Sequence, residues 1–137
     1  MHAFDIDAAA LGAIAADGAT PSASAADCAR AADLLLTSLP RPDHVDRVMR
    51  GAGALAALRP GSVWIDLTTN RKEFVAELAA EAPAGVRVVD SPVTGAVDGA
   101  RHGRLTLFVG GEDDLFGQVQ PVLGHLGDVV HCGPLGT

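Results

Sequence analysis

The longest polar segment between two apolar runs is Asp90-Ser91-Pro92-Val93-Thr94-Gly95-Ala96-Val97-Asp98-Gly99-Ala100. It places the hydroxyl group of Thr94 beside Gly95, and a glycine lets a ligand come close to the backbone. A threonine hydroxyl with adjacent backbone N–H groups suits a carboxylate ligand. The same residue types also form ordinary turns, so the spacing leaves a carboxylate site and a plain connection as alternatives.

Two other polar segments, Ser38-Leu39-Pro40 and Asp66-Leu67-Thr68-Thr69-Asn70, directly follow apolar runs. Ligands of open α/β sheets bind outside the carboxyl ends of the strands, so hydroxyl groups at these places can contact a ligand. They can equally cap the following helix. For Thr68 and Asn70 both interpretations stay open.

An acidic segment, Phe4-Asp5-Ile6-Asp7, ends the first apolar run. An acid at such a strand end accepts hydrogen bonds from the adenosine ribose of a dinucleotide, and it repels the additional phosphate of NADP. The alternative is a helix N-cap role for Asp5 or Asp7. The segment Gly51-Ala52-Gly53-Ala54-Leu55-Ala56 spells a dinucleotide fingerprint, but it follows a predicted helix rather than a strand, which favours a simple connection.

Several chemistries lack the residues they need. The five histidines have no metal-ligand spacing, and no serine or cysteine lies in a nucleophile elbow. The chain has no tyrosine and only one lysine, Lys72, which excludes dehydrogenases that pair a tyrosine with a lysine. We interpret Lys72 as a solvated helix residue, and Cys28 and Cys132 as reduced thiols of a cytoplasmic protein.

Apolar runs alternate with alanine-rich stretches, which is the pattern of strands and helices in a parallel sheet. The predicted strands are residues 2–6, 34–38, 62–66, 86–89, 105–109 and 129–131. The predicted helices are residues 8–16, 25–32, 71–80 and 113–126, and residues 43–50 have Val45, Val48 and Met49 on one helical face. Asp7, Ser24 with Asp27, and Asn70 with Glu73 are the predicted N-terminal signals, and Pro121 is expected to kink or divide the last helix.

The whole chain has 137 residues and a formal charge of −7, which predicts one modest domain. No stretch concentrates lysine or arginine, so nucleic acid is not an expected partner. The first residues carry acids instead of the positive charge of a signal peptide. No apolar run approaches the roughly 18 residues of a membrane span.

The second half carries a specific set of motifs. They are Ile65-Asp66-Leu67-Thr68-Thr69, Val89-Asp90-Ser91-Pro92-Val93-Thr94-Gly95, Gly99-Ala100, Gly103-Arg104-Leu105-Thr106-Leu107-Phe108-Val109-Gly110-Gly111, Pro121-Val122-Leu123 and Gly133-Pro134-Leu135-Gly136. With them the chain resembles the β-hydroxyacid dehydrogenases, the 3-hydroxyisobutyrate dehydrogenase group related to 6-phosphogluconate dehydrogenase. The resemblance covers nearly the whole chain, more loosely in the first half. It implies a Rossmann-like, doubly wound, mostly parallel α/β sheet.

The resemblance also implies site residues. Thr94, Gly95 and Ala96 correspond to the loop that binds the substrate carboxylate, with Ala96 in place of a usual glycine. Leu39, Pro40 and Thr69 correspond to the nicotinamide side of the cofactor cleft, Val45 to the adenine end, and Asp5 to the ribose-selecting position. Ile6 stands where NADP-preferring relatives carry arginine, so NAD is the expected cofactor and a small hydroxy acid the expected substrate, with hydride passing between them.

Compared with the family that the chain resembles, residues 1–137 are expected to be a partial NAD(P)-binding domain. The first βα unit and a C-terminal helical domain with a catalytic lysine are expected to be missing, so no catalytic residue is assigned. The isolated chain is expected to be inactive, because general acid–base catalysis needs such a group. The alternatives are a fragmentary gene and a non-catalytic α/β module that associates with a partner chain, or with a second copy, through an exposed sheet edge.

Overall fold

The computed structural model describes residues 1–137, in which strands alternate with helices. The strands are β1 (His2–Ala3), β2 (Thr20–Pro21), β3 (Leu34–Thr37), β4 (Val63–Asp66), β5 (Arg87–Asp90), β6 (Val93–Thr94), β7 (Leu105–Gly110) and β8 (Gly127–Gly133). The helices are α1 (Ala8–Ala16), α2 (Ala25–Ala31), α3 (Pro42–Asp46), α4 (Ala54–Ala57), α5 (Lys72–Glu81), α6 (Ala96–Arg101) and α7 (Asp113–Leu123), and α3 continues into a π-helical turn, η1 (Arg47–Gly51).

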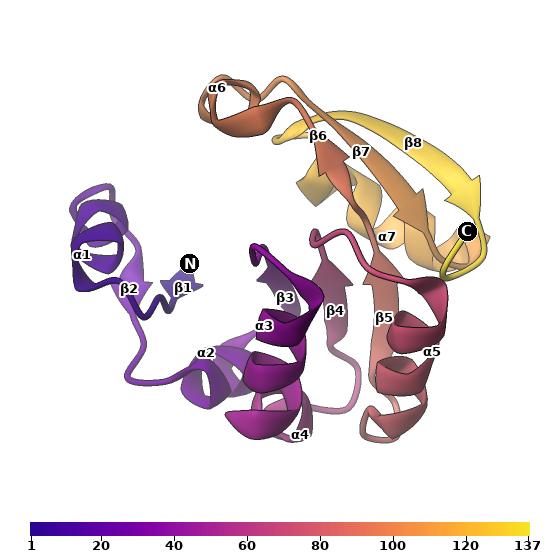
Figure 1. The fold of residues 1–137 in the computed structure, drawn as a ribbon, viewed down its shortest axis with the longest axis horizontal. Coiled ribbons are helices and arrows are strands. Elements are labelled where there is room, and N and C mark those ends of the chain that lie inside the picture. Colours follow the sequence, from indigo (N-terminus) through magenta and orange to yellow (C-terminus); the bar gives the residue numbers. More distant parts are fainter.

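Most strand pairs are parallel. The main sheet has the order β3-β4-β5-β7-β6, and β8 pairs with the other side of β7 (Figure 1). β6 runs antiparallel to β7, and β5 meets β7 antiparallel through the single pair Asp90 and Gly110. β1 and β2 form a separate, parallel two-stranded sheet. The expected Rossmann-like α/β class with a mostly parallel sheet is confirmed.

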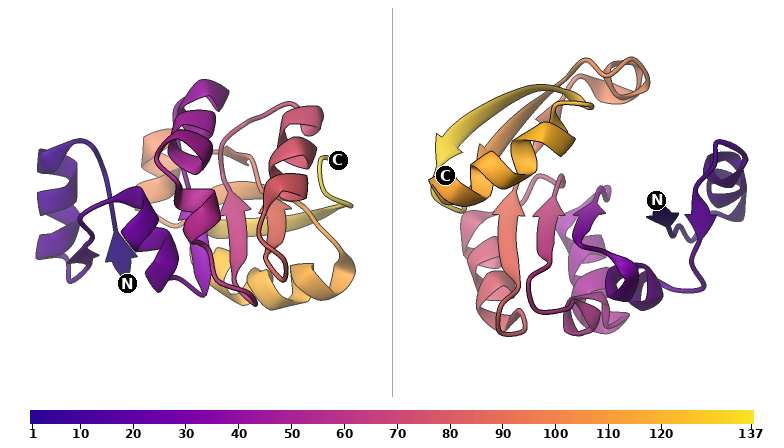
Figure 2. Two further views of the ribbon diagram at one scale, coloured as in Figure 1. Left: turned by 90° about the horizontal axis from the view of Figure 1, so that it is seen from below. Right: turned by 180° about the vertical axis from the view of Figure 1, so that it is seen from behind.

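Apolar residues on the two faces of the sheet belong to two cores. One core joins Leu35, Trp64 and Val88 to buried side chains of α2, α3, α4 and α5. The other joins Val63, Ile65 and Val89 to β7 and to α7. The left view of Figure 2 shows α3 and α5 on one side of the strands and α7 on the other. Neighbouring residues of β4 therefore point into different cores, as expected for parallel strands covered by helices on both faces.

The N-terminal part, β1 to β2, differs from its prediction. The strand predicted over residues 2–6 ends at Ala3, because Asp5 Oδ1 accepts a hydrogen bond from the Asp7 N–H (2.8 Å) and turns the chain. Asp7 then caps α1 as predicted, accepting from the Ala9 and Ala10 N–H groups. Ser24 likewise caps α2 by accepting from the Asp27 N–H (3.1 Å).

The helix predicted over residues 113–126 stays undivided. α7 contains Pro121 and ends at Leu123, so the prediction of a division was wrong, and the helix is three residues shorter. Pro121 lies two residues from the end of α7, where one missing N–H removes a hydrogen bond from the last turn only. None of the helices combines the length and the apolar character that crossing a membrane requires. Both cysteines are free thiols.

Candidate functional site

A row of polar residues crosses the main sheet where its parallel strands end. β3, β4 and β5 end at Thr37, Asp66 and Asp90, and the strand register places these three residues opposite one another. All three are buried. The loops that follow them leave the sheet at its carboxyl edge, which is where open α/β sheets bind ligands.

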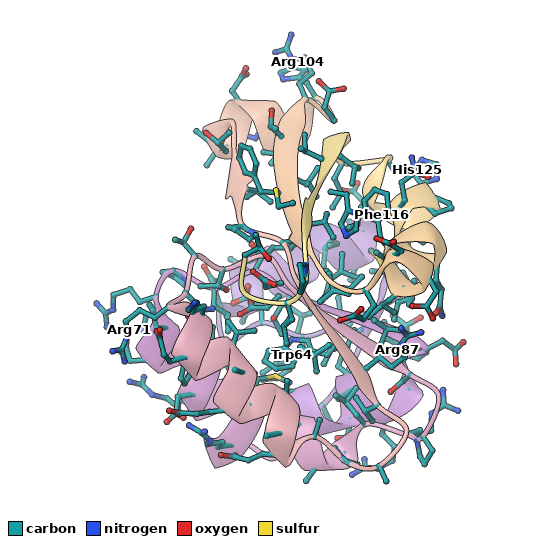
Figure 3. All side chains as sticks on the ribbon, turned by 90° about the vertical axis from the view of Figure 1, so that its right-hand side faces the viewer. Trp64, Arg71, Arg87, Arg104, Phe116 and His125 are labelled. Carbon is teal, nitrogen blue, oxygen red and sulfur yellow. The ribbon has the colours of Figure 1, made fainter.

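Asp66 is the centre of a buried hydrogen-bond network. Its Oδ1 accepts from the Thr37 hydroxyl (2.8 Å) and from the Thr68 N–H (3.1 Å), and its Oδ2 accepts from the Asn70 amide (2.6 Å). The Thr37 hydroxyl in turn accepts from the Trp64 indole N–H (2.9 Å), with Trp64 inside the molecule (Figure 3). The network fixes the loops after β3 and β4 relative to each other.

Burial dominates the electrostatics of this edge. It raises the pKa of Asp66 above its ordinary value, against the lowering effect of the bonds from Thr68 and Thr37, and the negative charge of Asp90 adds to the rise. Burial also raises the pKa of Asp90, whose bond from the Gly136 N–H opposes the shift. Both carboxyl groups therefore hold a proton more tightly than exposed aspartates do.

The residues expected on the nicotinamide side lie on two adjoining loops. Leu39 follows β3 and is half-buried, and its N–H donates to Thr68 Oγ1 (3.1 Å). Pro40 and Thr69 are exposed on the same two loops. The structure therefore brings Leu39, Pro40 and Thr69 together at the carboxyl edge.

Thr68 and Asn70 both bond inside the protein. The prediction that Asn70 opens the following helix was wrong: α5 begins at Lys72, and its N-cap residue, Arg71, makes no side-chain cap bond (Figure 3). The Asn70 amide donates instead to Asp66 and to the Thr68 carbonyl (3.2 Å). The buried carboxylate is the stronger acceptor for that amide, since bonds to charged groups are worth more than neutral ones.

The two residues expected at the adenosine end lie apart from these loops. Val45 is completely buried in α3, within the core on the α2–α5 side of the sheet. Asp5 is exposed just after β1, outside the main sheet, and Ile6 beside it is 94% exposed. The adenosine-binding roles of Asp5 and Val45 remain predictions.

The polar segment 90–100 contains the short strand β6 and the helix α6, which were not predicted, and both interpretations of its spacing stay open. Thr94 ends β6 and pairs with Thr106 of β7, and α6 starts two residues later. Gly95 has φ 127°, and a Cβ atom there would lie 3.1 Å from the Leu105 side chain. Ala96 has φ 52°, in the left-handed region that glycine occupies more easily.

One junction of the site went unpredicted. Asp90 Oδ1 accepts from the Gly136 N–H (2.8 Å), which ties the C-terminal segment to the end of β5. Gly110 lies between them, since a Cβ atom there would be 2.4 Å from Asp90 Oδ1 and 3.0 Å from the Pro134 carbonyl oxygen. Ser91 Oγ is buried beside this junction without a hydrogen-bond partner. Gly110-Gly111 and Gly133-Pro134-Leu135-Gly136 were noted as motifs in the sequence, but their contact with Asp90 was not predicted.

Segments that were set aside as unlikely sites lie away from this one. Gly51 is the last residue of the helical turn η1, and Ala52-Gly53 lead into the four-residue helix α4, so the segment is a connection after a helix, as predicted. Lys72 is exposed on the first turn of α5. No group of histidine, cysteine, aspartate or glutamate is arranged to hold a metal ion.

Known proteins resemble this chain in sequence and in fold. The chain is 36% identical to the 2-(hydroxymethyl)glutarate dehydrogenase of Eubacterium barkeri over 140 aligned residues, covering 100% of this chain and 46% of that enzyme. The 3-hydroxyisobutyrate dehydrogenase of Mycobacterium tuberculosis, solved with L-serine, superposes with a TM-score of 0.89 at 33% identity over 97% of this chain and 46% of that chain. Psf3, solved with NADP⁺ and 2-OPP, superposes with a TM-score of 0.89 at 26% identity, over 99% of this chain and 49% of that one.

The chain thus spans about half the length of these relatives. The family described as the NAD binding domain of 6-phosphogluconate dehydrogenase matches residues 1–133, nearly all of the sequence. The matched residues include β3, β4 and β5 with the loops that carry Leu39, Thr69 and Thr94. The chain belongs to the NAD-binding domain family of 6-phosphogluconate dehydrogenase.

Proposed function

We propose that this chain is the cofactor-binding part of an oxidoreductase that transfers hydride between a nicotinamide dinucleotide and a small 3-hydroxy acid similar to 3-hydroxyisobutyrate. The observation that carries the proposal is the alignment of Thr37, Asp66 and Asp90 at the carboxyl ends of three parallel strands. Their loops present the expected nicotinamide-side residues, and the strand after β5 presents Thr94.

The residues at the carboxyl edge fit a nicotinamide ring. Leu39 and Pro40 offer apolar surface, and Thr69 offers an exposed hydroxyl group next to them. A flat ring with a carboxamide needs this combination of apolar contact and a polar group that fixes its orientation. The bound cofactor supplies the hydride donor or acceptor, while the Asp66 network holds the loops in place.

A carboxylate substrate is supported by the next segment. Thr94 is exposed, and Gly95 beside it leaves the backbone accessible. L-Serine, the molecule named with the Mycobacterium tuberculosis relative, is itself a small 3-hydroxy acid. We propose that Thr94, Gly95 and Ala96 bind the carboxylate of such a substrate.

The proposal can be tested by amide chemical-shift mapping in NMR spectra of the chain. NAD⁺ is expected to shift the amides of Leu39 and Thr69, and 3-hydroxyisobutyrate those of Thr94 and Gly95. Chemical-shift mapping detects weak binding, so saturating ligand without shifts at these residues contradicts the proposal. Shifts confined to other elements would contradict it as well.

We further propose a preference for NAD over NADP. The Asp5 carboxylate is exposed, where it can accept bonds from ribose hydroxyls and repel a phosphate, and Ile6 beside it carries no positive charge. Replacing Ile6→Arg is expected to strengthen NADP⁺ binding over NAD⁺ in the same titrations. Ile14→Arg on α1, where the native side chain is also exposed, is the charge-matched control and is expected to leave the preference unchanged.

Turnover by these 137 residues alone is expected to be absent. The proton of the hydroxyl group must leave as hydride is transferred, and the sole lysine, Lys72, is solvent-exposed on α5. NADH formation from 3-hydroxyisobutyrate, followed by absorbance with the purified chain, checks this. We also propose a cytoplasmic location, which the two free cysteines support.

A second candidate function, a non-catalytic module that associates with a partner, is favoured by one observation. β1 and β3 each have only one hydrogen-bonded neighbour strand, and so each keeps an open backbone edge. Chemical-shift mapping distinguishes the two candidates, because a module without cofactor binding shows no NAD⁺-dependent shifts.

A further inference from the structure

β8 is the longest strand of the chain, and its outer edge is open. The strand spans seven residues and pairs only with β7. It is the outermost strand in Figure 1 and in the rear view of Figure 2. Edge strands of native proteins are usually short, or they carry lysine, proline or a bulge that prevents pairing. β8 contains neither lysine nor proline, and the register shift lies near the end of the pairing, between Val109 and Gly110 of β7.

The register with β7 identifies the backbone groups on this edge. The Leu105 N–H donates to the Leu126 carbonyl (3.1 Å), and Leu105 is paired with Gly127. In a parallel pair, the residues whose backbone groups face the partner strand alternate along the strand. The backbone groups of residues 126, 128 and 130 therefore face β7. Those of Gly127, Val129 and His131 point outward, where β8 has no neighbouring strand.

Apolar side chains border this edge on both faces of the sheet. Val130 is the direct partner of Phe108 on β7, and the two side chains are 44% and 41% exposed. Val129 lies on the opposite face, where it packs against the core that includes α7. The His131 ring is on that face too and stacks on Phe116 of α7, with 4.4 Å between the ring centroids. A strand that pairs with β8 therefore gains apolar contacts as well as backbone hydrogen bonds.

We propose that the outer edge of β8 is a self-association site, where β8 of a second copy pairs antiparallel about a two-fold axis at Val130. In this register the backbone groups of Val129 meet those of His131 in the other copy, so both outward-pointing residues gain hydrogen bonds. Val130 faces its own counterpart in a non-hydrogen-bonded pair, the kind in which side chains come closest. The two Phe108–Val130 pairs then form one apolar stripe across both sheets.

The charges of β8 favour this register and a second copy as the occupant. Asp128 is the only acidic residue of the strand, which has no lysine or arginine. With the axis at Val130, Asp128 lies opposite the thiol of Cys132, whereas an axis at Asp128 would place two carboxylates directly opposite each other. β8 therefore matches itself without a like-charge contact. Because the pairing occupies β8 in both copies, the assembly closes as a dimer.

Sedimentation equilibrium of the purified chain, from dilute to near-millimolar concentration, tests the proposal. We expect a reversible monomer–dimer equilibrium that tightens as salt is added, because each copy has a formal charge of −7 and salt screens the repulsion between copies. In hydrogen exchange, the amides of Val129 and His131 should exchange more slowly in the dimer. The amides of Asp128 and Val130, which face β7, are internal controls and should not change.

Variants at the axis test the register. Val130→Lys places two lysine side chains opposite each other, and we expect it to weaken the dimer at least about tenfold. Val130→Thr keeps a β-branched side chain and is expected to retain the dimer. Ile14→Lys on α1, where the native side chain is 38% exposed, is the charge-matched control and should dimerise like the unmodified chain. Equal weakening by Val130→Lys and Ile14→Lys overturns the proposal, and so does a folded chain that stays monomeric.

A disulfide reads the same register directly. With Cys132→Ser in the background, Val130→Cys is expected to give a cross-linked dimer with oxidised glutathione, since the Cβ atoms of such a pair lie about 4.5 to 5.5 Å apart. Ile14→Cys in the same background is the control and should give far less. Equal yields overturn the proposal even for a chain that aggregates through other edges. A dimer that protects the amides of β3 instead of those of Val129 and His131 overturns it as well.

This self-association does not depend on cofactor binding, so the two can be tested separately. A chain that dimerises through β8 without binding NAD⁺ contradicts the proposed function only. A chain that binds NAD⁺ but shows neither the protection of Val129 and His131 nor the cross-link contradicts the self-association site only.

Discussion

Asp66 makes the stability of the fold depend on pH in mild acid. Its raised pKa means that the folded state binds the proton more tightly than the unfolded chain, whose aspartates titrate near 3.8. The contribution of Asp66 to stability is therefore most favourable below that value, and it declines as pH rises through the raised pKa. We expect the unmodified chain to gain stability relative to Asp66→Asn as pH falls from 7 towards 4, measured by urea unfolding.

Asp43→Asn is the control for this prediction, because the pKa of Asp43 is shifted in the opposite direction. The bond from Arg41 lowers the pKa of the exposed Asp43 to about 2. Stability from that group is present above its unfolded value and is lost as pH falls towards 2. Asp43→Asn should therefore become relatively more stable in acid. A stability difference between the unmodified chain and Asp66→Asn that stays constant with pH would count against a raised Asp66 pKa.

Ala96 carries a backbone cost that glycine would not. Its φ of 52° lies in the left-handed region, where a side chain costs about 1 to 2 kcal/mol. Ala96→Gly relieves that cost. Part of the gain in stability is lost, because glycine gives the unfolded chain more conformational freedom. We expect a net stabilisation of up to about 1 kcal/mol in urea unfolding. Ala100→Gly, in the same helix α6, is expected to destabilise the protein by a similar amount. If Ala96→Gly destabilised the protein as Ala100→Gly does, the backbone cost assigned to Ala96 would be refuted.

At the scale of elements, the Thr37 hydroxyl links β3 to β4. It donates to Asp66 and accepts from Trp64, so Thr37→Val leaves a buried donor and a buried carboxylate each without one partner. We expect this variant to lose about 2 kcal/mol or more of unfolding free energy. Thr37→Ser keeps both bonds and removes one methyl group, which costs about 0.8 kcal/mol. Calorimetry measures both variants. Equal losses of unfolding free energy in Thr37→Val and Thr37→Ser would mean that the two hydrogen bonds of the Thr37 hydroxyl contribute little to stability.

Local signals in the sequence predicted local structure well. Asp7 and Ser24 cap the helices they precede, because the groups that they bind lie two or three residues away. Asn70 failed as a cap because the Asp66 carboxylate, brought into reach by the end of β4, competes for its amide. The pattern of residue types could not reveal that competition.

The candidate site was predicted in outline only. Leu39 and Thr69 follow predicted strands, which apolar runs define, whereas β6, the strand that ends at Thr94, was not predicted. The bond from Gly136 to Asp90 joins residues 46 positions apart, and no local pattern encodes such a contact. The same holds for Thr37 and Asp66, 29 positions apart, whose bond depends on the register of two strands.

At the scale of the whole molecule, stability is expected to be uneven. β4 is completely buried between two cores, whereas α1 has no buried residue. Regions with few buried apolar contacts open at low free energy, so the amides of α1 should exchange faster than those of β4 by orders of magnitude. Hydrogen exchange followed by mass spectrometry measures this. Equal protection of α1 and β4 would show that the N-terminal part is stabilised by contacts outside those described.

Trp64 also gives the chain a built-in optical probe. The protein has one tryptophan and no tyrosine, so its ultraviolet emission comes from this single indole. Because the ring is fully buried and its N–H is bonded to Thr37 directly beneath the loops after β3 and β4, the emission wavelength depends on the polarity of that one place. Fluorescence can therefore follow changes at the carboxyl edge without any label.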